Sequence, residues 1–272
     1  MIDFIDVHKS FGTLHVLRGI NLTFERGLTT VVLGRSGTGK SVTLKCIVRL
    51  LEPDKGEVLV EGKNVVDMDR DELDKWRARC GFLFQGGAMY DSMTIEENLV
   101  FPLRNRKDIS ASDKTELAKE KLSWVGLSGT LAKYPSDLSG GMRKRAALAR
   151  TLMTEPEVIL YDEPTTGLDP ITSNEISQLI ARLKEERGVT SIAVTHDMPA
   201  ARLVADRIAF LHRGTVLASG TWEEIEAIDN PLVQFFLATE FTRDPIEVAD
   251  EQYGGTPEES EEEPENAVKE EA

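Results

Sequence analysis

The sequence has few cysteines, no long apolar run and no excess of basic residues. Its 272 residues include only Cys46 and Cys80, which lack the spacing of a metal-binding pair and which we expect to be reduced, structural thiols. No apolar stretch reaches the roughly 18 residues of a membrane-spanning helix, so any connection with a membrane is expected to come through a partner. The net charge of −15 argues against a nucleic-acid-binding surface. The first residues lack the basic and apolar segments of a signal peptide, so we expect none.

The acidic residues are unevenly distributed along the chain. Residues 244–272 contain 12 acidic residues against one lysine, a local charge of −11 out of the total of −15. A segment with this much charge and so few apolar residues buries too little surface to fold by itself. We therefore expect a folded domain over residues 1–243, close to neutral, and an acidic, disordered tail over residues 244–272.

The strongest pattern in the chain is TTVVLGRSGTGKSVTLKCIVRLL, residues 29–51. Residues 30–33 predict a buried strand, three glycines follow within six residues, and apolar residues at helical spacing then predict a helix that reaches Leu51. In this order the pattern G-x-x-x-x-G-K-[ST] has chemical meaning, because glycine lets backbone N–H groups face a phosphate at the helix N-terminus. Lys40 is expected to reach the β- and γ-phosphates and Ser41 to bind Mg²⁺. The sequence therefore predicts nucleotide binding.

Alternating residues near the N-terminus predict a small antiparallel sheet. Residues 2–7 and 16–24 alternate between apolar and polar, with residues 9–15 as the turn, and residues 57–65 predict a further strand pair. Phe11 lies in the predicted turn. By itself, such an aromatic residue packs on its hairpin more often than it stacks on a nucleotide base. The motifs further along the chain favour stacking on the base.

Polar side chains follow three other predicted strands. Gln85 ends the strand predicted at 81–85, and His196 follows the strand predicted at 190–195. Asp162 and Glu163 follow the apolar run at residues 158–161. Ligands of nucleotide-binding sheets lie beyond the carboxyl ends of strands. Asp162 is therefore a candidate for Mg²⁺ binding, Glu163 for the base that polarises the attacking water, and His196 for a γ-phosphate contact. Gln85 is compatible either with a metal or water contact or with capping a loop.

A second candidate anion site lies further along the chain. Ser139, Gly140 and Gly141 open a long predicted helix, whose N-terminus attracts anions. The basic run at residues 143–145, with Arg150, follows on the same helix. Such a run is compatible either with a solvated face or with support of an anionic site.

An all-helical insertion is predicted around residues 102–137. Met89, Tyr90 and Met93 lie in a loop before it. Methionine and aromatic residues on a loop favour an adaptable contact surface for a partner. Packing inside the helical segment is the alternative with equal weight.

The chain resembles the ATP-binding subunit of ATP-binding-cassette (ABC) transporters over residues 1 to about 240. The resemblance rests on five features in this order: the phosphate loop at residues 34–39, Gln85, LSGGM, YDEPTTGLD and His196. The resemblance implies an α/β fold, with a RecA-like phosphate-loop NTPase core, a small antiparallel β subdomain and an inserted α-helical subdomain at about residues 86–150, which would contact the membrane subunit. It also implies a head-to-tail dimer holding two ATP molecules between the phosphate loop of one copy and the LSGGM turn of the other, with Asp169 coupling the two sites.

The resemblance also assigns roles to individual residues. Glu163, His196 and Gln85 would be catalytic, and Ser41, Gln85 and Asp162 would hold Mg²⁺. The implied nucleotide-binding residues are Phe11, Gly34, Arg35, Ser36, Gly37, Thr38, Gly39, Lys40, Ser41, Val42, Ser139, Gly140, Gly141 and Asp169.

Finer details are similar to the ATPase of Mla/Mce-type phospholipid transporters. They are GKSV at 39–42, FQGGAMYDSMTIEENLVFPL, Met142 where glutamine is usual, RKRAALAR and NPLVQFFLAT. This resemblance implies ATP hydrolysis coupled to phospholipid movement between the inner and outer membranes. The subunit would lie on the cytoplasmic face of the inner membrane, attached through an integral-membrane permease. A Mce-type lipid-binding protein and a small regulatory subunit are further candidate partners.

Three alternatives compete with this interpretation. Within transport, the cargo could instead be an amino acid, a metal or another lipid-linked substrate. A cassette ATPase acting on DNA or ribosomes would need a coiled-coil insertion, zinc cysteines, two cassettes in one chain or a strongly basic surface, and none occurs here. A soluble phosphate-loop kinase would have no use for the second anion site. We therefore expect a transport ATPase without a nucleic-acid partner.

Overall fold

Two sheets organise the described chain, which comprises residues 1–238 of a computed structural model. The predicted acidic tail at 244–272 lies outside the described residues. The six-stranded sheet runs in the order β10 (Thr215–Gly220), β9 (Arg207–His212), β3 (Thr29–Leu33), β8 (Thr190–Thr195), β7 (Val158–Asp162) and β6 (Cys80–Leu83). The four-stranded sheet runs in the order β2 (Leu14–Phe24), β1 (Ile2–Phe11), β4 (Lys55–Val60) and β5 (Lys63–Asn64).

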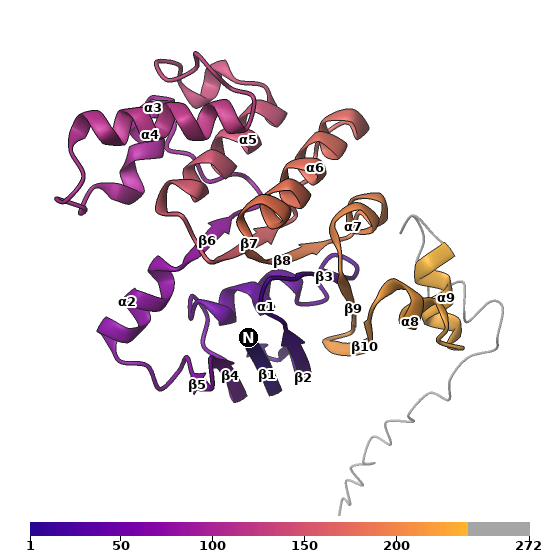
Figure 1. Ribbon diagram of the computed structural model, residues 1–272. Helices are drawn as coiled ribbons and strands as arrows, with labels where there is room; N and C mark the ends of the chain where they lie inside the picture. Colours follow the sequence, from indigo (N-terminus) through magenta and orange to yellow (C-terminus); the bar gives the residue numbers. More distant parts are fainter. Residues whose placement is uncertain (239–272) are drawn as a thin grey trace, which may run out of the picture.

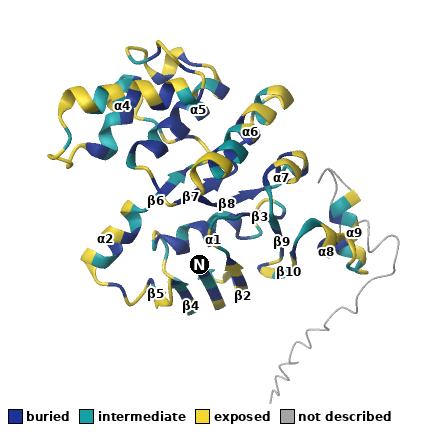
Figure 2. Cartoon of the chain, in the orientation of Figure 1, coloured by how far each residue is buried: buried dark blue, intermediate teal, exposed yellow. Residues whose placement is uncertain are grey.

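The six-stranded sheet is parallel except for β10, which pairs with β9 in the antiparallel sense. Every residue of β3, β7 and β8 is buried, and these strands are dark blue in Figure 2. Strands covered on both faces read as continuous apolar runs, which is why the sequence predicted them. Because the strands are parallel, their carboxyl ends meet at one edge of the sheet, where the phosphate loop follows β3.

The hairpin of β1 and β2 is longer than predicted. The prediction of a turn over residues 9–15 was wrong, because the strands continue to Phe11 and from Leu14. Register shifts between Phe4 and Val7 and beyond interrupt the pairing, and Asp6 has a φ of 48°. A bulge changes which face successive residues occupy, so the alternation fades while the strand continues.

Helix α1 (Lys40–Ile47) ends one turn before the predicted limit at Leu51. Arg49 has a φ of 49°, which takes the chain out of the helix. Its guanidinium donates to the carbonyl oxygens of Val65, Val66 and Met68 at 2.8–3.0 Å. This long-range contact fixes the helix end and leaves no local sequence signal. The next helix, α2 (Arg70–Ala78), begins with a capping box made by Asp69 and Glu72.

A lobe of helices lies between β6 and β7, above the sheet in Figure 1. It contains α3 (Ile95–Val100), α4 (Ala111–Trp124) and α5 (Gly140–Thr151), with 3-10 turns η1 (Phe101–Leu103), η2 (Pro135–Asp137) and η3 (Leu152–Thr154). Its buried residues, among them Leu99, Leu122 and Leu148, share one apolar cluster with Tyr161 of β7. Four further helices follow: α6 (Pro170–Arg187), α7 (Met198–Val204), α8 (Trp222–Glu226) and α9 (Pro231–Ala238).

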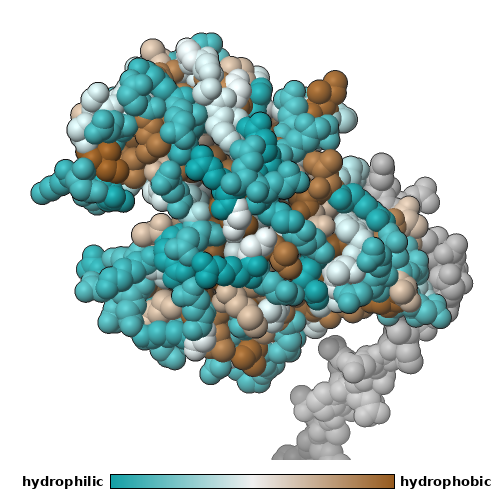
Figure 3. Space-filling view, in the orientation of Figure 1, coloured by the Kyte–Doolittle hydropathy of each residue, from teal (hydrophilic) through white to brown (hydrophobic). Residues whose placement is uncertain are grey.

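Within residues 1–238, no helix is long and apolar enough to cross a membrane. On the face shown in Figure 3, hydrophilic residues cover most of the surface and apolar residues form separate patches.

Candidate active site

The phosphate loop occupies the gap between the carboxyl end of β3 and the start of α1. Gly34 and Gly39 have no room for a side chain, since an added Cβ would lie 2.4 Å from the Leu211 carbonyl oxygen and 2.6 Å from Leu17 Cδ2, respectively. Gly39 also has a φ of 101°. Ser36 at the loop tip is exposed. Backbone packing thus fixes the base of the loop while its tip stays accessible to a ligand.

Lys40 lies beneath this loop and is only 5% exposed. Its Nζ donates to the carbonyl oxygens of Gly34 at 2.6 Å and Arg35 at 3.0 Å, and it lies 3.2 Å from Glu163 Oε1. Burial lowers the pKa of Lys40, while the nearby charge of Glu163 acts in the opposite direction. The loop therefore holds a cationic donor inside a glycine-rich turn, an arrangement suited to an anion.

Ser41 and Asp162 meet at the same edge of the sheet. The Ser41 hydroxyl donates to Asp162 Oδ1 at 2.6 Å, and Asp162 is 5% exposed. Within residues 1–238, no group of three or more His, Cys, Asp or Glu side chains is arranged to hold a metal ion. A divalent ion here would need further ligands from a bound phosphate and water, and Mg²⁺ is commonly held in this way. The hydroxyl and carboxylate oxygens therefore fit Mg²⁺ bound together with a nucleotide.

Gln85 lies at the same edge but makes no hydrogen bond in the described chain. Leu83 pairs with Tyr161 in the parallel register of β6 and β7, and Gln85 and Glu163 each lie two residues further on. Strand β6 ends at Leu83, so the prediction that the strand itself reaches Gln85 was wrong. The Gln85 side chain is exposed at the end of this short connection.

Glu163 is only 7% exposed, and several partners fix its carboxylate. Its Oε2 accepts a hydrogen bond from the Thr166 hydroxyl at 3.0 Å and lies 2.9 Å from His196 Nδ1. Its backbone N–H donates to the Val194 carbonyl oxygen at 2.9 Å. Glu163 also has a φ of 48°, in the left-handed region. Such conformations persist only when surrounding contacts hold them, and they cluster at functional sites.

The remaining predicted site residues lie outside this cluster. Phe11 is 46% exposed at the hairpin tip, with Lys9 Nζ 5.7 Å from its ring centroid. Ser139 caps α5 by accepting from the Met142 N–H at 3.2 Å, and Asp169 caps α6. Within residues 1–238, Lys40 makes no hydrogen bond or ion pair with Phe11, Ser139 or Asp169. One chain therefore presents two separate groups of predicted residues.

The second group is itself held together. An added Cβ on Gly141 would lie 2.3 Å from Thr172 Cγ2, so only glycine fits between the start of α5 and the start of α6. The Thr172 hydroxyl donates to Asp169 Oδ2 at 2.6 Å. Hydrogen bonds from Thr172 lower the pKa of Asp169. The LSGGM turn and Asp169 are thus positioned against one another.

Sequence reasoning missed Thr166 and left the basic run of α5 open. Lys144 is 8% exposed, and its Nζ donates to the carbonyl oxygens of Glu163 at 3.2 Å and Thr166 at 2.6 Å. Burial lowers the pKa of Lys144, with Glu163 acting in the opposite direction. The solvated-face interpretation is therefore wrong for Lys144. Its spacing of three and four residues from Gly141 and Leu148, on the buried face, could have indicated this.

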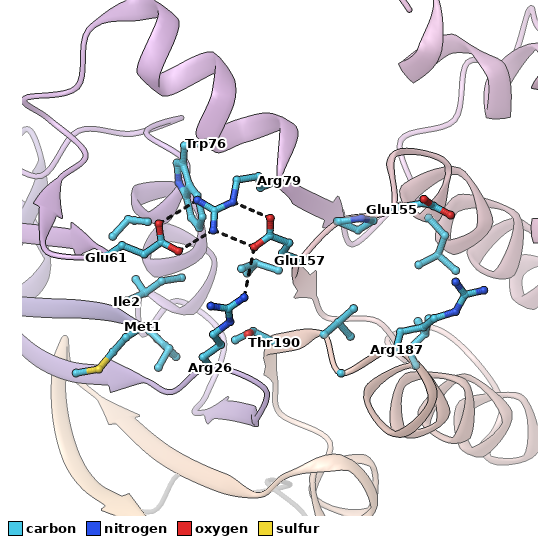
Figure 4. A pocket seen from close by; sticks show the side chains of 18 of the residues that line it. Met1, Ile2, Arg26, Glu61, Trp76, Arg79, Glu155, Glu157, Arg187 and Thr190 are labelled. Atoms are coloured by element: carbon cyan, nitrogen blue, oxygen red, sulfur yellow. Dashed lines mark hydrogen bonds and ion pairs between the residues drawn. The ribbon is translucent and has the colours of Figure 1, made fainter. Parts of the chain in front are cut away.

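A separate cavity of about 360 Å³ lies at the amino ends of β7 and β8, where Val158 and Thr190 line it (Figure 4). On one wall the Arg79 guanidinium donates to both carboxylate oxygens of Glu61 and of Glu157, at 2.7–3.1 Å. The phosphate loop follows the opposite end of the parallel sheet. This cavity therefore lies apart from the candidate active site.

Sequence comparisons identify relatives over most of the chain. A family model described as ABC transporter matches residues 17–166. The probable ribonucleotide transport ATP-binding protein mkl of Mycobacterium tuberculosis is 41% identical over 229 residues, covering 84% of this chain and 64% of that protein. The chain thus spans 64% of the length of this mycobacterial relative. The intermembrane phospholipid transport system ATP-binding protein MlaF of Escherichia coli is 38% identical over 237 residues, covering 87% and 88%. The chloroplastic protein TRIGALACTOSYLDIACYLGLYCEROL 3 of Arabidopsis thaliana is 40% identical over 252 residues, covering 87% and 73%.

Solved structures share the fold. The dimeric structure of MJ0796, a bacterial ABC transporter cassette, matches with a TM-score of 0.75 and 36% identity, covering 81% of this chain and 98% of that one. The structure of cbiO1 from Clostridium perfringens, part of the transporter complex cbiONQ, matches with a TM-score of 0.75 and 29% identity, covering 87% and 94%. The predicted α/β cassette fold is confirmed. The chain belongs to the ABC transporter family.

Proposed function

We propose that this chain binds and hydrolyses ATP and so energises a membrane transporter. The observation that carries the proposal is the cluster at the carboxyl ends of β3, β7 and β8, where Lys40 and His196 contact Glu163 and the Ser41 hydroxyl contacts Asp162. A further neighbour supports hydrolysis: the post-hydrolysis state of the MJ0796 cassette bound to ADP and Pi, which is 35% identical with a TM-score of 0.74.

In this proposal the ATP phosphates lie on the loop at residues 34–39 and meet the Lys40 ammonium. Ser41, Asp162 and Gln85 hold Mg²⁺, which neutralises charge on the phosphates when bound. Phe11, exposed at its hairpin tip, stacks on the adenine. The full proposed nucleotide contacts on one copy are Phe11, Gly34, Arg35, Ser36, Gly37, Thr38, Gly39, Lys40, Ser41 and Val42.

Glu163 is the proposed base for the attacking water. A carboxylate needs a fixed orientation to accept a proton as the water attacks, and the contacts with Thr166 and His196 supply it. His196, with its side chain 43% exposed, can also reach a γ-phosphate while it holds Glu163. The side chains are thus arranged so that base, metal and phosphate meet at one edge of the sheet.

A second copy of the chain completes the proposed site. Ser139, Gly140 and Gly141 of one copy would bind the phosphates held by the loop of the other, because they lie at the N-terminus of α5, where Ser139 and Gly140 are exposed. Asp169, held next to Gly141 through Thr172, would couple the two sites. The dimeric structure of the MJ0796 cassette supports a dimer of this chain.

The proposed cargo is phospholipid, moved between the inner and outer membranes. It is supported by the similarity to MlaF, the ATP-binding protein of an intermembrane phospholipid transport system, of which this chain covers 88%. The name of the mycobacterial relative, a probable ribonucleotide transport protein, favours another cargo as the alternative. The chain would lie on the cytoplasmic face of the inner membrane, held by an integral-membrane permease, with a Mce-type lipid-binding protein and a small regulatory subunit as further proposed partners. We expect domain limits of 1–243, with 86–150 as the inserted lobe.

Transfer of lipid between vesicles tests the cargo. The complex that copurifies with the full chain would be reconstituted into vesicles with a fluorescent phosphatidylglycerol, and transfer to acceptor vesicles measured. We expect transfer that requires Mg-ATP and is lost with Glu163→Gln. A fluorescent nucleoside serves as the control cargo. ATP turnover with movement of the nucleoside and no lipid transfer would contradict the phospholipid assignment and leave the ATPase assignment intact.

The loop at residues 89–93 is the proposed permease contact. The two interpretations from the sequence divide within it: Met89 packs against the buried core, while Tyr90 is 44% exposed. Asn98, fully buried, donates to the carbonyl oxygens of Tyr90 and Met93 at 3.0 and 3.1 Å. The loop is therefore rigid, and it directs the Tyr90 ring, 4.8 Å from the ring of Phe101, to the surface. A rigid aromatic anchor is typical of protein interfaces.

We expect Tyr90→Asp to leave the isolated subunit folded and to abolish permease copurification. The melting temperature should change by only about 2 °C, as for most surface substitutions. Tyr134→Asp is the matched control, because Tyr134 lies in the same lobe and is 45% exposed. Full copurification of a stable Tyr90→Asp variant would refute the docking role, as would a large drop in melting temperature, which would place the ring in the interior.

A further inference from the structure

Lys144 is a buried cation whose contacts are unusual for a lysine. It is 8% exposed, and no carboxylate of the described chain forms an ion pair with it. Its Nζ instead donates to two backbone carbonyl oxygens, those of Glu163 and Thr166. Burying a charge is costly unless its hydrogen-bonding capacity is used. These two carbonyls belong to the turn that carries the proposed base.

The turn at residues 163–166 needs such support. Glu163 has a φ of 48°, and the Thr166 N–H lies 3.4 Å from the Glu163 carbonyl oxygen, a long backbone hydrogen bond. The Thr166 hydroxyl in turn donates to Glu163 Oε2. An ammonium that binds both carbonyls therefore fixes the backbone of Glu163 and the hydroxyl that orients its carboxylate.

The position of Lys144 on α5 adds a second consequence. Lys144 lies one helical turn after Gly140, so it shares a rigid helix with the LSGGM turn at residues 138–142. Gly141 contacts Thr172 at the far side of the same connection. The first part of α5 thus holds the segment from Glu163 to Thr172 at two points.

We propose that Lys144 is a positioning residue that fixes the turn of Glu163 and links its orientation to helix α5. This inference rests on the proposed role of Glu163 as base. When the LSGGM turn engages a nucleotide on the partner copy, movement of α5 is transmitted through Lys144 to the Glu163 backbone of its own chain. The chemistry class is ATP hydrolysis, and Lys144 acts only through Glu163.

The test substitutes Lys144→Met, which keeps the length of the side chain and removes the donors. With the full chain in its purified transporter complex, we expect kcat for ATP to fall by about 100-fold, the size expected when a reacting group is misplaced by about 1 Å. KM and the affinity for a fluorescent ATP analogue should remain unchanged. Lys144→Arg should recover most of the turnover, because the guanidinium retains charged donors for both carbonyls. Lys119→Met, an exposed lysine of the same lobe, is the matched control.

A double variant separates positioning from a merely structural role. If Lys144 acts through Glu163, Glu163→Gln with Lys144→Met will be no slower than Glu163→Gln alone. Turnover near the parent value for Lys144→Met would refute the inference, as would equal losses of kcat and nucleotide affinity without recovery by Lys144→Arg. If Lys144→Met does not fold, the kcat and KM of Lys144→Arg and Lys144→Gln will be measured instead. Parent-like turnover of Lys144→Gln would then refute the inference. Parent-like turnover of Glu163→Gln would instead refute the proposed function.

Discussion

Replacing Glu163 with glutamine is expected to leave ATP binding intact and to lower turnover by about 10²–10⁴-fold, the contribution of a positioned base. The amide keeps the shape of the side chain and loses its basicity. Two carboxylates end β7, and Asp162 already has the Ser41 hydroxyl as its partner. Glu163, between Lys40 and His196, is therefore the one available to accept a proton.

The measurement combines steady-state ATP hydrolysis by the transporter complex with gel filtration in Mg-ATP. Because hydrolysis no longer separates the two copies of the ATP-bound dimer, we expect the variant to accumulate as a dimer with retained ATP. Glu185→Gln, an exposed glutamate on α6, controls for the loss of one negative charge. Hydrolysis by Glu163→Gln near the parent rate would show that another group is the base.

Lys40→Ala should have the opposite profile and remove nucleotide binding itself. The Lys40 Nζ donates to the Gly34 carbonyl oxygen at 2.6 Å and lies 3.2 Å from Glu163 Oε1, and Lys40 is 5% exposed. Truncating one member of a buried ion pair costs about 3–5 kcal/mol. If a similar free energy of interaction with the phosphates is lost, ATP affinity should fall by about 10²–10⁴-fold.

Titration with a fluorescent ATP analogue measures this loss directly. Lys45→Ala is the control, since Lys45 lies on the same helix and makes no side-chain hydrogen bond in the described residues. A melting curve establishes that each variant is folded. Parent-like affinity of Lys40→Ala would contradict the phosphate-binding role, whatever the behaviour of Glu163→Gln.

The fold could be predicted wherever local pattern and tertiary environment agree. Buried parallel strands such as β3 and β7 read as apolar runs because both faces are covered. The prediction was wrong where long-range contacts intervened. The end of α1 depends on Arg49 contacting carbonyls of residues 65–68, and the length of β1 depends on a bulge at Asp6. Neither contact changes the local periodicity.

The site could be predicted where one short segment carries the chemistry. The phosphate loop and the pair Asp162 and Glu163 each combine a strand end with the required side chains. The roles of Lys144 and Thr166 were not predicted, because Lys144 contacts backbone carbonyl oxygens and Thr166 contacts the carboxylate of nearby Glu163. A carbonyl acceptor has no residue type, so no sequence motif records it. The position of Lys144 on the buried face of α5 was the one available signal.

The order of strands in the six-stranded sheet has a consequence for synthesis of the protein. Strand β3 ends at Leu33, yet its neighbours in the described sheet, β8 and β9, begin at Thr190 and Arg207. At about 5–20 residues per second, a delay of roughly 10 to 35 s separates the appearance of β3 from that of its second partner. The base of the phosphate loop at Gly34 also packs closely against the backbone of Leu211, which is synthesised much later. A nascent chain therefore contains every residue of the phosphate loop long before it can hold a nucleotide, and binding competence arrives only after strand β9 has been synthesised.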